Sequence, residues 1–260
     1  MSSASRLLAI LDLFDERRPV WSAEEAARDL NVSVSTAYRY IRALCAAELL
    51  VPVSGDGYRI GPAVLKYDRL LRLSDPLIEA GAPVLARIQT IAGDAVSTFL
   101  ARLFRDRVMC VLAERGPKAP KSISFERGRP MPMFQGATSK IILANLPRRS
   151  LKRLYDANKE AIAETMGIAD WRALLDMLRR LRRTGIAVSR GEVDTGLVGT
   201  AAPIFDDQEA VIASLSIVGR ATAIDDAELY RLTELARSAA AEISDGLRYV
   251  SVSGTPRTAS

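Results

Sequence analysis

Residues 26–44 have the sequence AARDLNVSVSTAYRYIRAL, which is typical of two helices joined by a tight turn. The turn is expected at residues 30–32, where a short apolar-faced helix ends. Ser33 then has the place of an N-cap for a second helix that runs to about residue 47. The second helix is predicted to bury Val34, Ala37, Ile41, Leu44 and Cys45.

The flanking segments extend this pair of helices into a small domain. Apolar residues at helical spacing predict a preceding helix over residues 7–14. Ser22 and Glu25 have the spacing of a capping box, in which both side chains bond to free amides at a helix start. Residues 50–53 and 58–60 are predicted strands around a Ser-Gly-Asp-Gly turn.

A helix-turn-helix followed by a two-stranded wing, here residues 1–61, is a DNA-binding arrangement because its second helix fits the major groove. Hydroxyl groups and free amides at that helix start suit phosphate, and arginine suits phosphate or a guanine edge. A plain three-helix packing unit with solvated arginines is the alternative, but the capped helix, the acid-free helix and the wing occur here in the order that favours DNA. The candidate contacts are Ser33, Ser35, Thr36, Tyr38, Arg39, Arg42 and, on the wing, Arg59.

The charge distribution supports DNA binding locally rather than globally. The chain has 36 Lys and Arg against 31 Asp and Glu, a formal net charge of +5. Residues 1–75 contain ten basic and ten acidic residues, so the excess lies in residues 76–260. Between residues 30 and 47 the only charged residues are Arg39 and Arg42, which leaves the predicted recognition helix free of acids.

The rest of the chain is predicted to form a linker helix at residues 62–75, a mixed α/β domain at residues 76–250 and a disordered tail at residues 251–260. Helices are expected at residues 76–92, 136–146, 149–157, 170–183 and 225–247. Strands are expected at residues 95–103, 108–115, 121–126, 186–189, 199–205 and 211–218. The predicted fold class is therefore α+β.

The composition excludes several classes of enzyme and metalloprotein. The 260 residues are 48% hydrophobic, enough for a globular core, and they include two cysteines and no histidine. A chain without histidine has no Ser-His-Asp or Cys-His nucleophile pair and no histidine-ligated zinc or haem. Phosphate-binding glycine loops, signal peptides and membrane-spanning runs are also missing from the sequence. We therefore expect a cytoplasmic protein that is not an enzyme and binds no metal or cofactor.

Nearly the whole chain, residues 5–250, resembles the IclR family of bacterial transcriptional regulators. The resemblance rests on residues 26–44, on ELLVPVSGDGYRIGPAVL at 48–65, on GRPMPMFQGATSKIILANLP at 128–147 and on TGIAVSRGEVDTGLVGTAAPIFDDQEAVIASLSIVGRA at 184–221. It implies an N-terminal winged helix-turn-helix, a linker helix and a C-terminal GAF-like domain that binds a small effector. It also implies dimers or tetramers that bind operator DNA and act as repressors, activators or both.

The predicted effector site centres on Gly136-Ala-Thr-Ser139, small residues at the start of an apolar helix. Free amides at such a start bind anions such as carboxylates, although an ordinary capped helix is the commoner use of this pattern. With the strands that the resemblance implies, the candidate ligand contacts are Phe134, Ala137, Thr138, Ser139, Ser189, Gly199 and Ser216. The nearby Lys140, Glu192 and Asp194 are expected to face solvent or lie in turns, outside the site.

Several positions depart from the family pattern and bear on the effector. Phe134 stands where the family often has His, Gly199 where it often has Cys, and Val218 where it has Ser or Gly. Ala137 and Ser139 stand where the family often has Gly. We expect a pocket that Gly199 enlarges and that Phe134 and Val218 make more apolar, which favours an aromatic carboxylate. The alternative is an effector-independent regulator whose second domain only oligomerises.

Overall fold

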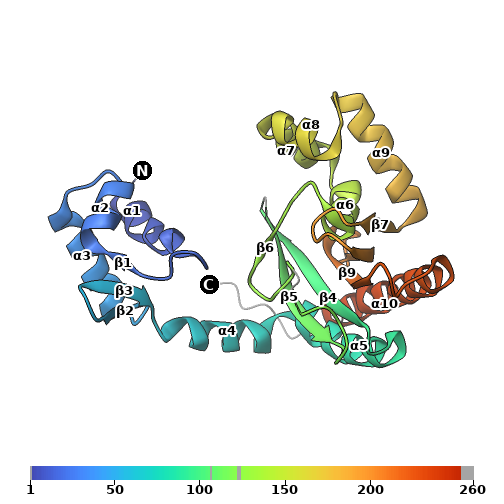
Figure 1. The fold of residues 1–260 in the computed structure, drawn as a ribbon, viewed down its shortest axis with the longest axis horizontal. Coiled ribbons are helices and arrows are strands. Elements are labelled where there is room, and N and C mark those ends of the chain that lie inside the picture. Colours follow the sequence, from blue (N-terminus) through green and yellow to red (C-terminus); the bar gives the residue numbers. More distant parts are fainter. Residues whose placement is uncertain (1, 106, 122–123, 253–260) are drawn as a thin grey trace. The chain divides into compact units, whose positions relative to one another are not determined.

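The structure, a computed structural model, describes residues 2–105, 107–121 and 124–252. The chain divides into two units, Met1–Ser74 and Asp75–Ser260, each with its own hydrophobic core (Figure 1). The boundary lies at the end of the predicted linker helix, which belongs with the first unit. Within the described residues, no helix combines the length and the apolar character needed to span a membrane.

The first unit is a helix-turn-helix with a small three-stranded sheet. Its elements are α1 (Ser3–Ala9), the 3-10 helix η1 (Leu11–Leu13), β1 (Trp21–Ser22), α2 (Ala23–Asp29), α3 (Val34–Ala46), β2 (Leu50–Val53), β3 (Gly57–Ile60) and α4 (Ala63–Ser74). The antiparallel sheet has the order β1-β3-β2. Strand β1 is an addition to the predicted two-stranded wing, and its two residues are too few to show a sequence pattern.

The predicted signals at the starts of α2 and α3 are confirmed. Ser22 Oγ accepts a hydrogen bond from the amide of Glu25 at 3.2 Å, and the Glu25 carboxylate accepts one from the amide of Ser22 at 2.9 Å. Asn31 has a φ of 51°, the left-handed conformation that allows the tight turn between the helices. Ser33 Oγ then accepts from the amide of Thr36 at 3.3 Å, a cap of the kind that stabilises a helix by about 1 kcal/mol.

The core of the first unit differs from the prediction at one turn of α3. Ile41 and Leu44 are buried as expected, but Val34 is 44% exposed because the first turn of the helix extends beyond the core. Tyr40 is buried in addition. Its ring packs inward, while its hydroxyl forms a 3.0 Å hydrogen bond with the hydroxyl of Ser3 in α1.

The second unit is a six-stranded antiparallel sheet with helices on both faces (Figure 1). Its elements are α5 (Pro76–Ala92), β4 (Val96–Phe104), β5 (Arg107–Arg115), β6 (Pro130–Met131), α6 (Gly136–Asn145), α7 (Arg148–Ala157), α8 (Lys159–Met166), α9 (Trp171–Thr184), β7 (Ala187–Arg190), β8 (Leu197–Phe205), β9 (Val211–Arg220) and α10 (Asp226–Val252). The strand order is β6-β5-β4-β9-β8-β7. The two units together confirm the predicted α+β class.

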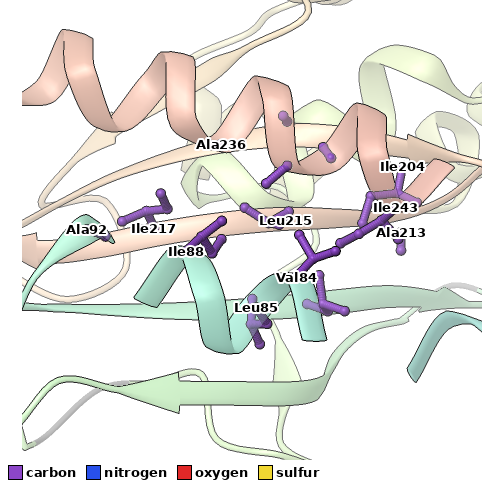
Figure 2. Close-up of a cluster of buried hydrophobic side chains, with 14 of the residues drawn as sticks. Val84, Leu85, Ile88, Ala92, Ile204, Ala213, Leu215, Ile217, Ala236 and Ile243 are labelled. Atoms are coloured by element: carbon purple, nitrogen blue, oxygen red, sulfur yellow. The ribbon is translucent and has the colours of Figure 1, made fainter. Parts of the chain in front are cut away.

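The largest core fills the space between the sheet and the two helices α5 and α10. Figure 2 shows Val84 and Ile88 of α5, Leu215 of β9, and Ala236 and Ile243 of α10 meeting in this layer, where all five are buried. Helix α6 packs on the opposite face, against β7, β8 and β9. The start of α6 therefore lies directly over the sheet.

Three predictions for the second unit are corrected. The described residues 121 and 124–126 are not a strand, and the short strand β6 in the following segment pairs with β5 instead. Helix α8 has no counterpart in the prediction because it buries only Ile162 and so has little periodicity. Helix α10 continues to Val252, two residues into the predicted tail, and residues 253–260 of that tail lie outside the described residues.

Candidate functional site

Helix α3 presents a polar side to solvent. Ser35, Arg39 and Arg42 are exposed there, opposite the side that packs in the core. The guanidinium carbon of Arg39 lies 5.6 Å from the centre of the Tyr40 ring. Arg42 forms no hydrogen bond or ion pair with the described residues. An exposed guanidinium without a partner can bind a phosphate or a guanine edge.

The start of α3 gathers three hydroxyl groups. Ser33 Oγ lies 2.8 Å from Thr36 Oγ1 and 3.1 Å from Ser35 Oγ. The amides of Val34 and Ser35 donate no hydrogen bond to the part of the chain that the structure describes. Free amides and hydroxyls at a helix start are suited to an anionic oxygen such as that of a phosphate.

Tyr38 is held by an acid from the neighbouring helix. Its hydroxyl donates a 3.0 Å hydrogen bond to Glu24 Oε1 of α2. This bond raises the pKa of Tyr38, and it adds to a backbone hydrogen bond that lowers the pKa of Glu24. Helix α3 itself therefore contains no acid, as predicted, but Glu24 of the neighbouring helix α2 places a carboxylate beside it.

The wing carries the last of the candidate DNA contacts. Arg59 lies on β3, is exposed and has no ion pair among the described residues. The turn between β2 and β3 has Gly55 at φ 81° and Asp56 at φ 59°, as a tight hairpin with two left-handed residues requires. The hairpin thus presents Arg59 on a short and regular ribbon.

A narrow cavity lies on the face of the sheet that α6 covers. Five of the predicted ligand contacts line it, namely Ala137, Thr138, Ser189, Gly199 and Ser216. The strand register explains this, because Ser189 of β7 faces Gly199 of β8, and Ser216 of β9 is paired with Ala201 of β8. The apolar part of the lining consists of Phe99, Phe125, Met131, Val193, Leu197 and Val218.

The polar groups at the base of the cavity are partly paired with one another. Thr138 Oγ1 and Ser216 Oγ lie 2.9 Å apart, and Ser214 Oγ donates to the carbonyl of Thr138 at 3.3 Å. The amides of Ala137 and Thr138 donate no hydrogen bond within the described residues. These two amides are therefore available to an acceptor on a ligand.

Two predicted ligand contacts are not in the lining. Phe134 belongs to the buried hydrophobic cluster that also contains Ile142 and Leu143 of α6. Ser139 is fully buried, and its hydroxyl donates to the carbonyl of Pro132 at 2.7 Å. Neither side chain is part of the cavity lining, and the Ser139 hydrogen bond instead ties α6 to the loop that precedes it.

The expectation that Gly199 enlarges the cavity is also wrong. A Cβ atom built on Gly199 would stand 2.5 Å from Cγ2 of Val218, its neighbour on β9. Val218 therefore fills the space that the glycine leaves. The cavity is lined by aromatic and aliphatic side chains, as expected, but Phe99 and Phe125 supply the aromatic part instead of Phe134. Their rings stack with centres 4.2 Å apart.

Three charged residues placed outside the site by the sequence belong to it or to its edge. Glu192 and Asp194 line the cavity from the loop between β7 and β8. Glu192 Oε2 accepts from the amide of Gly136 at 3.0 Å and from Nζ of Lys140 at 2.6 Å. The only sequence signal is the position of both acids between Gly191 and Gly196 in a strand-connecting loop, which does not reveal their partners.

Comparison with known proteins identifies both units. Residues 3–53 match the IclR helix-turn-helix domain, and residues 73–245 match the C-terminal domain of the bacterial transcriptional regulator IclR. The HTH-type transcriptional regulator BhcR of Paracoccus denitrificans is 26% identical over 243 residues, which are 93% of this chain and 86% of the relative.

Solved structures share the complete fold. An IclR transcriptional regulator from Silicibacter sp. TM1040 superimposes with a TM-score of 0.80 at 21% identity, over 95% of this chain and 96% of that chain. An IclR homologue from Microbacterium hydrocarbonoxydans, complexed with 4-hydroxybenzoate, has a TM-score of 0.75 at 21% identity, over 95% of this chain and 100% of that chain.

The family matches agree with the structure in order and extent. The helix-turn-helix match includes α1 to β2, and the C-terminal match begins at residue 73, beside the boundary between the two units. The C-terminal match alone extends over more than half of the chain. The chain therefore belongs to the IclR family of DNA-binding bacterial transcriptional regulators.

Proposed function

We propose that this regulator binds operator DNA through α3 and the wing, as a dimer or tetramer in the cytoplasm, and that a small aromatic carboxylate changes its affinity for DNA. The DNA-binding part rests on one observation, the exposed side of α3. On this side Arg42 has no partner among the described residues, and the amides at the start of the helix donate no hydrogen bond to them. In this proposal Arg39 and Arg42 contact base edges or phosphates in the major groove. The remaining contacts are made by Ser33, Ser35, Thr36, Tyr38 and Arg59.

The role of Tyr38 follows from its bond with Glu24. The hydroxyl proton of Tyr38 is directed at the carboxylate, so its oxygen lone pairs are left to accept hydrogen bonds. Phosphate oxygens are acceptors only, whereas cytosine and adenine present amino donors in the major groove. We therefore assign Tyr38 to a base amino group rather than to the DNA backbone.

The effector part of the proposal is supported by the cavity over the sheet. Free amides of Ala137 and Thr138 suit a carboxylate, and the stacked rings of Phe99 and Phe125 suit an aromatic body. The Microbacterium homologue with 4-hydroxybenzoate has the same fold and a ligand of this class. An effector alters DNA affinity only by its preference for one arrangement of the protein, typically about 1–3 kcal/mol.

Self-association is supported by the surface of α4. Six large apolar side chains on this helix are between 42% and 75% exposed, and Ala63 is its one buried residue among those described. Such an apolar surface is characteristic of an interface. The six residues are Val64, Leu65, Tyr67, Leu70, Leu71 and Leu73.

Operator titrations test the proposal. The full chain should shift a DNA fragment that carries its operator at lower concentration than a fragment of scrambled sequence, at one stated salt concentration. Addition of 4-hydroxybenzoate or another aromatic carboxylate should move the midpoint by about five- to 150-fold. An operator affinity that no member of a carboxylate panel changes would contradict the effector part and leave the DNA-binding part standing.

An effector-independent regulator whose second unit only oligomerises is the second candidate. One observation favours it, since Glu192 already occupies the start of α6, where a ligand's carboxylate would bind. Calorimetry with the same panel separates the two candidates. Saturable heat at one site per chain supports the effector, and its absence across the panel supports the second candidate.

A further inference from the structure

The cavity contains a carboxylate of its own. One oxygen of Glu192 accepts from the amide of Gly136, the first residue of α6, at 3.0 Å. The same oxygen accepts from Nζ of Lys140, one turn further along the helix, at 2.6 Å. Glu192 thereby has two favourable partners that an external carboxylate would also seek, the positive end of a helix and an ammonium group.

The charge of the lining makes this arrangement a barrier to anions. Glu192 and Asp194 are the charged residues of the lining, and no Lys or Arg of the described chain is part of it. A ligand carboxylate at the amides of Ala137 and Thr138 would lie beside Glu192 with no cation left unpaired, because Lys140 already neutralises Glu192. Two carboxylates at one site repel each other.

Two contacts besides that of Glu192 hold the middle of the loop. Val193 lies over the start of α6, where a Cβ atom built on Gly136 would stand 3.0 Å from Cγ2 of Val193. Asp194 accepts from the amide and the hydroxyl of Ser124, at 3.0 Å and 2.6 Å. Release of Glu192 would therefore leave the Asp194 attachment in place.

The ends of the loop are held by backbone hydrogen bonds, because the amide of Gly191 donates to the carbonyl of Leu197 at 2.8 Å and the carbonyl of Gly196 accepts from the amide of Ala221 at 2.8 Å. Gly191 and Gly196 have φ of 67° and 79°, conformations that residues other than glycine rarely adopt. Between them, the Glu192 contact with α6 is made by a side chain alone. A change at Glu192 can thus move this part of the loop without disturbing β7 or β8.

We propose that Glu192 holds the place of the effector's carboxylate, and that an anionic effector binds by exchange with it, taking over Gly136 and Lys140. This inference rests on the proposed effector function. Glu192 then sets the affinity of the pocket for anionic ligands, and the loop at residues 191–196 is released from α6 when such a ligand binds. A neutral ligand of the same shape does not replace the carboxylate and leaves the loop attached.

The test compares two ligands and two proteins by calorimetry on the full chain. The probes are 4-hydroxybenzoate and its neutral isostere 4-hydroxybenzamide, and the proteins are the parent and Glu192→Gln. In Glu192→Gln, loss of the competing charge should raise the affinity for 4-hydroxybenzoate about tenfold. The affinity for 4-hydroxybenzamide should change by less than about twofold. Glu164→Gln, which removes an exposed acid on α8, is the matched control and should change neither affinity.

The variant Lys140→Gln adds a second requirement. In the Glu192→Gln background, Lys140→Gln should cancel most of the gain in affinity for 4-hydroxybenzoate, because it removes the ammonium group that would bind the ligand's carboxylate. An affinity for 4-hydroxybenzoate that is unchanged or weaker in Glu192→Gln overturns the inference while the parent still binds, so the effector function survives. Absence of 4-hydroxybenzoate binding to both proteins overturns the exchange, and absence of binding across the whole carboxylate panel overturns the effector function as well.

Hydrogen exchange of the loop supplies a readout that does not depend on affinity. The peptide covering residues 190–197 should exchange faster in Glu192→Ala than in the parent, since the contact with α6 is lost. Addition of 4-hydroxybenzoate to the parent should also raise its exchange, whereas 4-hydroxybenzamide should not. Slower loop exchange with 4-hydroxybenzoate, or equal exchange in the parent and Glu192→Ala, would overturn the proposal.

Discussion

Val218 on β9 fills the space that the absent side chain of Gly199 leaves on β8. The two residues are register partners, and a Cβ on Gly199 would come within 2.5 Å of Val218 Cγ2. Real Cβ atoms do not approach a methyl group that closely, and the branched Val218 has little rotamer freedom to withdraw. The wall of the cavity at this point is therefore set by the pair rather than by either residue.

Substitution at this pair should show strong coupling. Gly199→Ala should lower the free energy of unfolding by about 1–3 kcal/mol because it overpacks the wall. Val218→Ala in the same chain should restore most of that loss, since it removes the clashing methyl group. Denaturant unfolding of both single variants and the double variant measures the coupling.

The control for this cycle is Val188→Ala on β7, an exposed valine paired with Thr200 rather than with Gly199. Its effect should simply add to that of Gly199→Ala. If Gly199→Ala and Val218→Ala are also additive, the packing relationship described above is wrong.

Arg42→Ala should weaken operator binding by about 1–3 kcal/mol if the guanidinium contacts a base, with a loss of discrimination at one position. If it contacts a phosphate, the loss should be similar for all sequences and the salt slope should fall by about one. Fluorescence anisotropy at several salt concentrations distinguishes the two. Arg180→Ala on α9, an exposed arginine of the second unit, is the control; equal losses for both variants would remove α3 as the DNA reader.

The apolar surface of α4 predicts a self-association defect. Leu65→Glu combined with Leu73→Glu places charges at two of its most exposed leucines. Sedimentation at micromolar concentration should show a shift toward the monomer, with weaker operator binding because one half-site contact is lost. Leu8→Glu on α1, another exposed leucine, should keep the parent's mass. A parent chain that sediments as a monomer and still binds DNA tightly would contradict the dimer.

Asp75 joins the start of α5 to the sheet, and its loss should destabilise the second unit. Its carboxylate accepts from the amide of Leu77 at 2.9 Å and from Arg102 on β4 at 2.6 Å, with the aspartate side chain only 3% exposed. Asp75→Ala should cost about 2–4 kcal/mol, because it removes a cap and leaves a partly buried guanidinium unpaired.

The surface variant Asp156→Asn on α7 should cost less than about 1 kcal/mol and serves as its control. Denaturant midpoints compare the two. A cost for Asp75→Ala as small as that of the control would show that the buried ion pair contributes nothing measurable.

The two thiols should differ in reactivity. Burial raises the pKa of Cys110 to about 12, and it also raises the pKa of the half-buried Cys45. Since the thiolate is the reactive form, Cys110 should not be labelled by a thiol reagent at pH 8 until the protein unfolds. In Cys45→Ser, labelling should track unfolding by denaturant, and rapid labelling of the folded variant would contradict the burial of Cys110.

Elements whose signals are local are predictable from the sequence. The Ser22–Glu25 capping box, the turn at Asn31 and the cap at Ser33 each involve residues within one helical turn, and each is present in the structure. Elements with short or weak patterns, such as β1, β6 and α8, could not be predicted from the sequence. A strand of two residues, or a helix with one buried side chain, shows no apolar periodicity.

The periodicity of apolar residues also predicts which face of a helix is buried better than it predicts which side chains that face contacts. The pattern of α3 places Ile41 and Leu44 in the core. It does not show that Val34, in the first turn of the helix, lies outside the core, or that the Tyr40 hydroxyl forms a hydrogen bond with that of Ser3. The prediction that the start of α6 and the neighbouring strands together form a ligand site rested on the family resemblance. The exclusion of Phe134 and Ser139 from the cavity came from their three-dimensional packing.

The charge and shape of the cavity depend on contacts between segments that are distant in the sequence. Glu192 meets Lys140 across 52 positions of sequence, and Asp194 meets Ser124 across 70. Whether an acid is a solvated turn residue or the occupant of a helix start depends on distances that arise when the sheet brings these segments together. Hydrogen bonds and close packing act over a few ångströms, so a pattern along the chain specifies which side chains are able to meet but not which of them do.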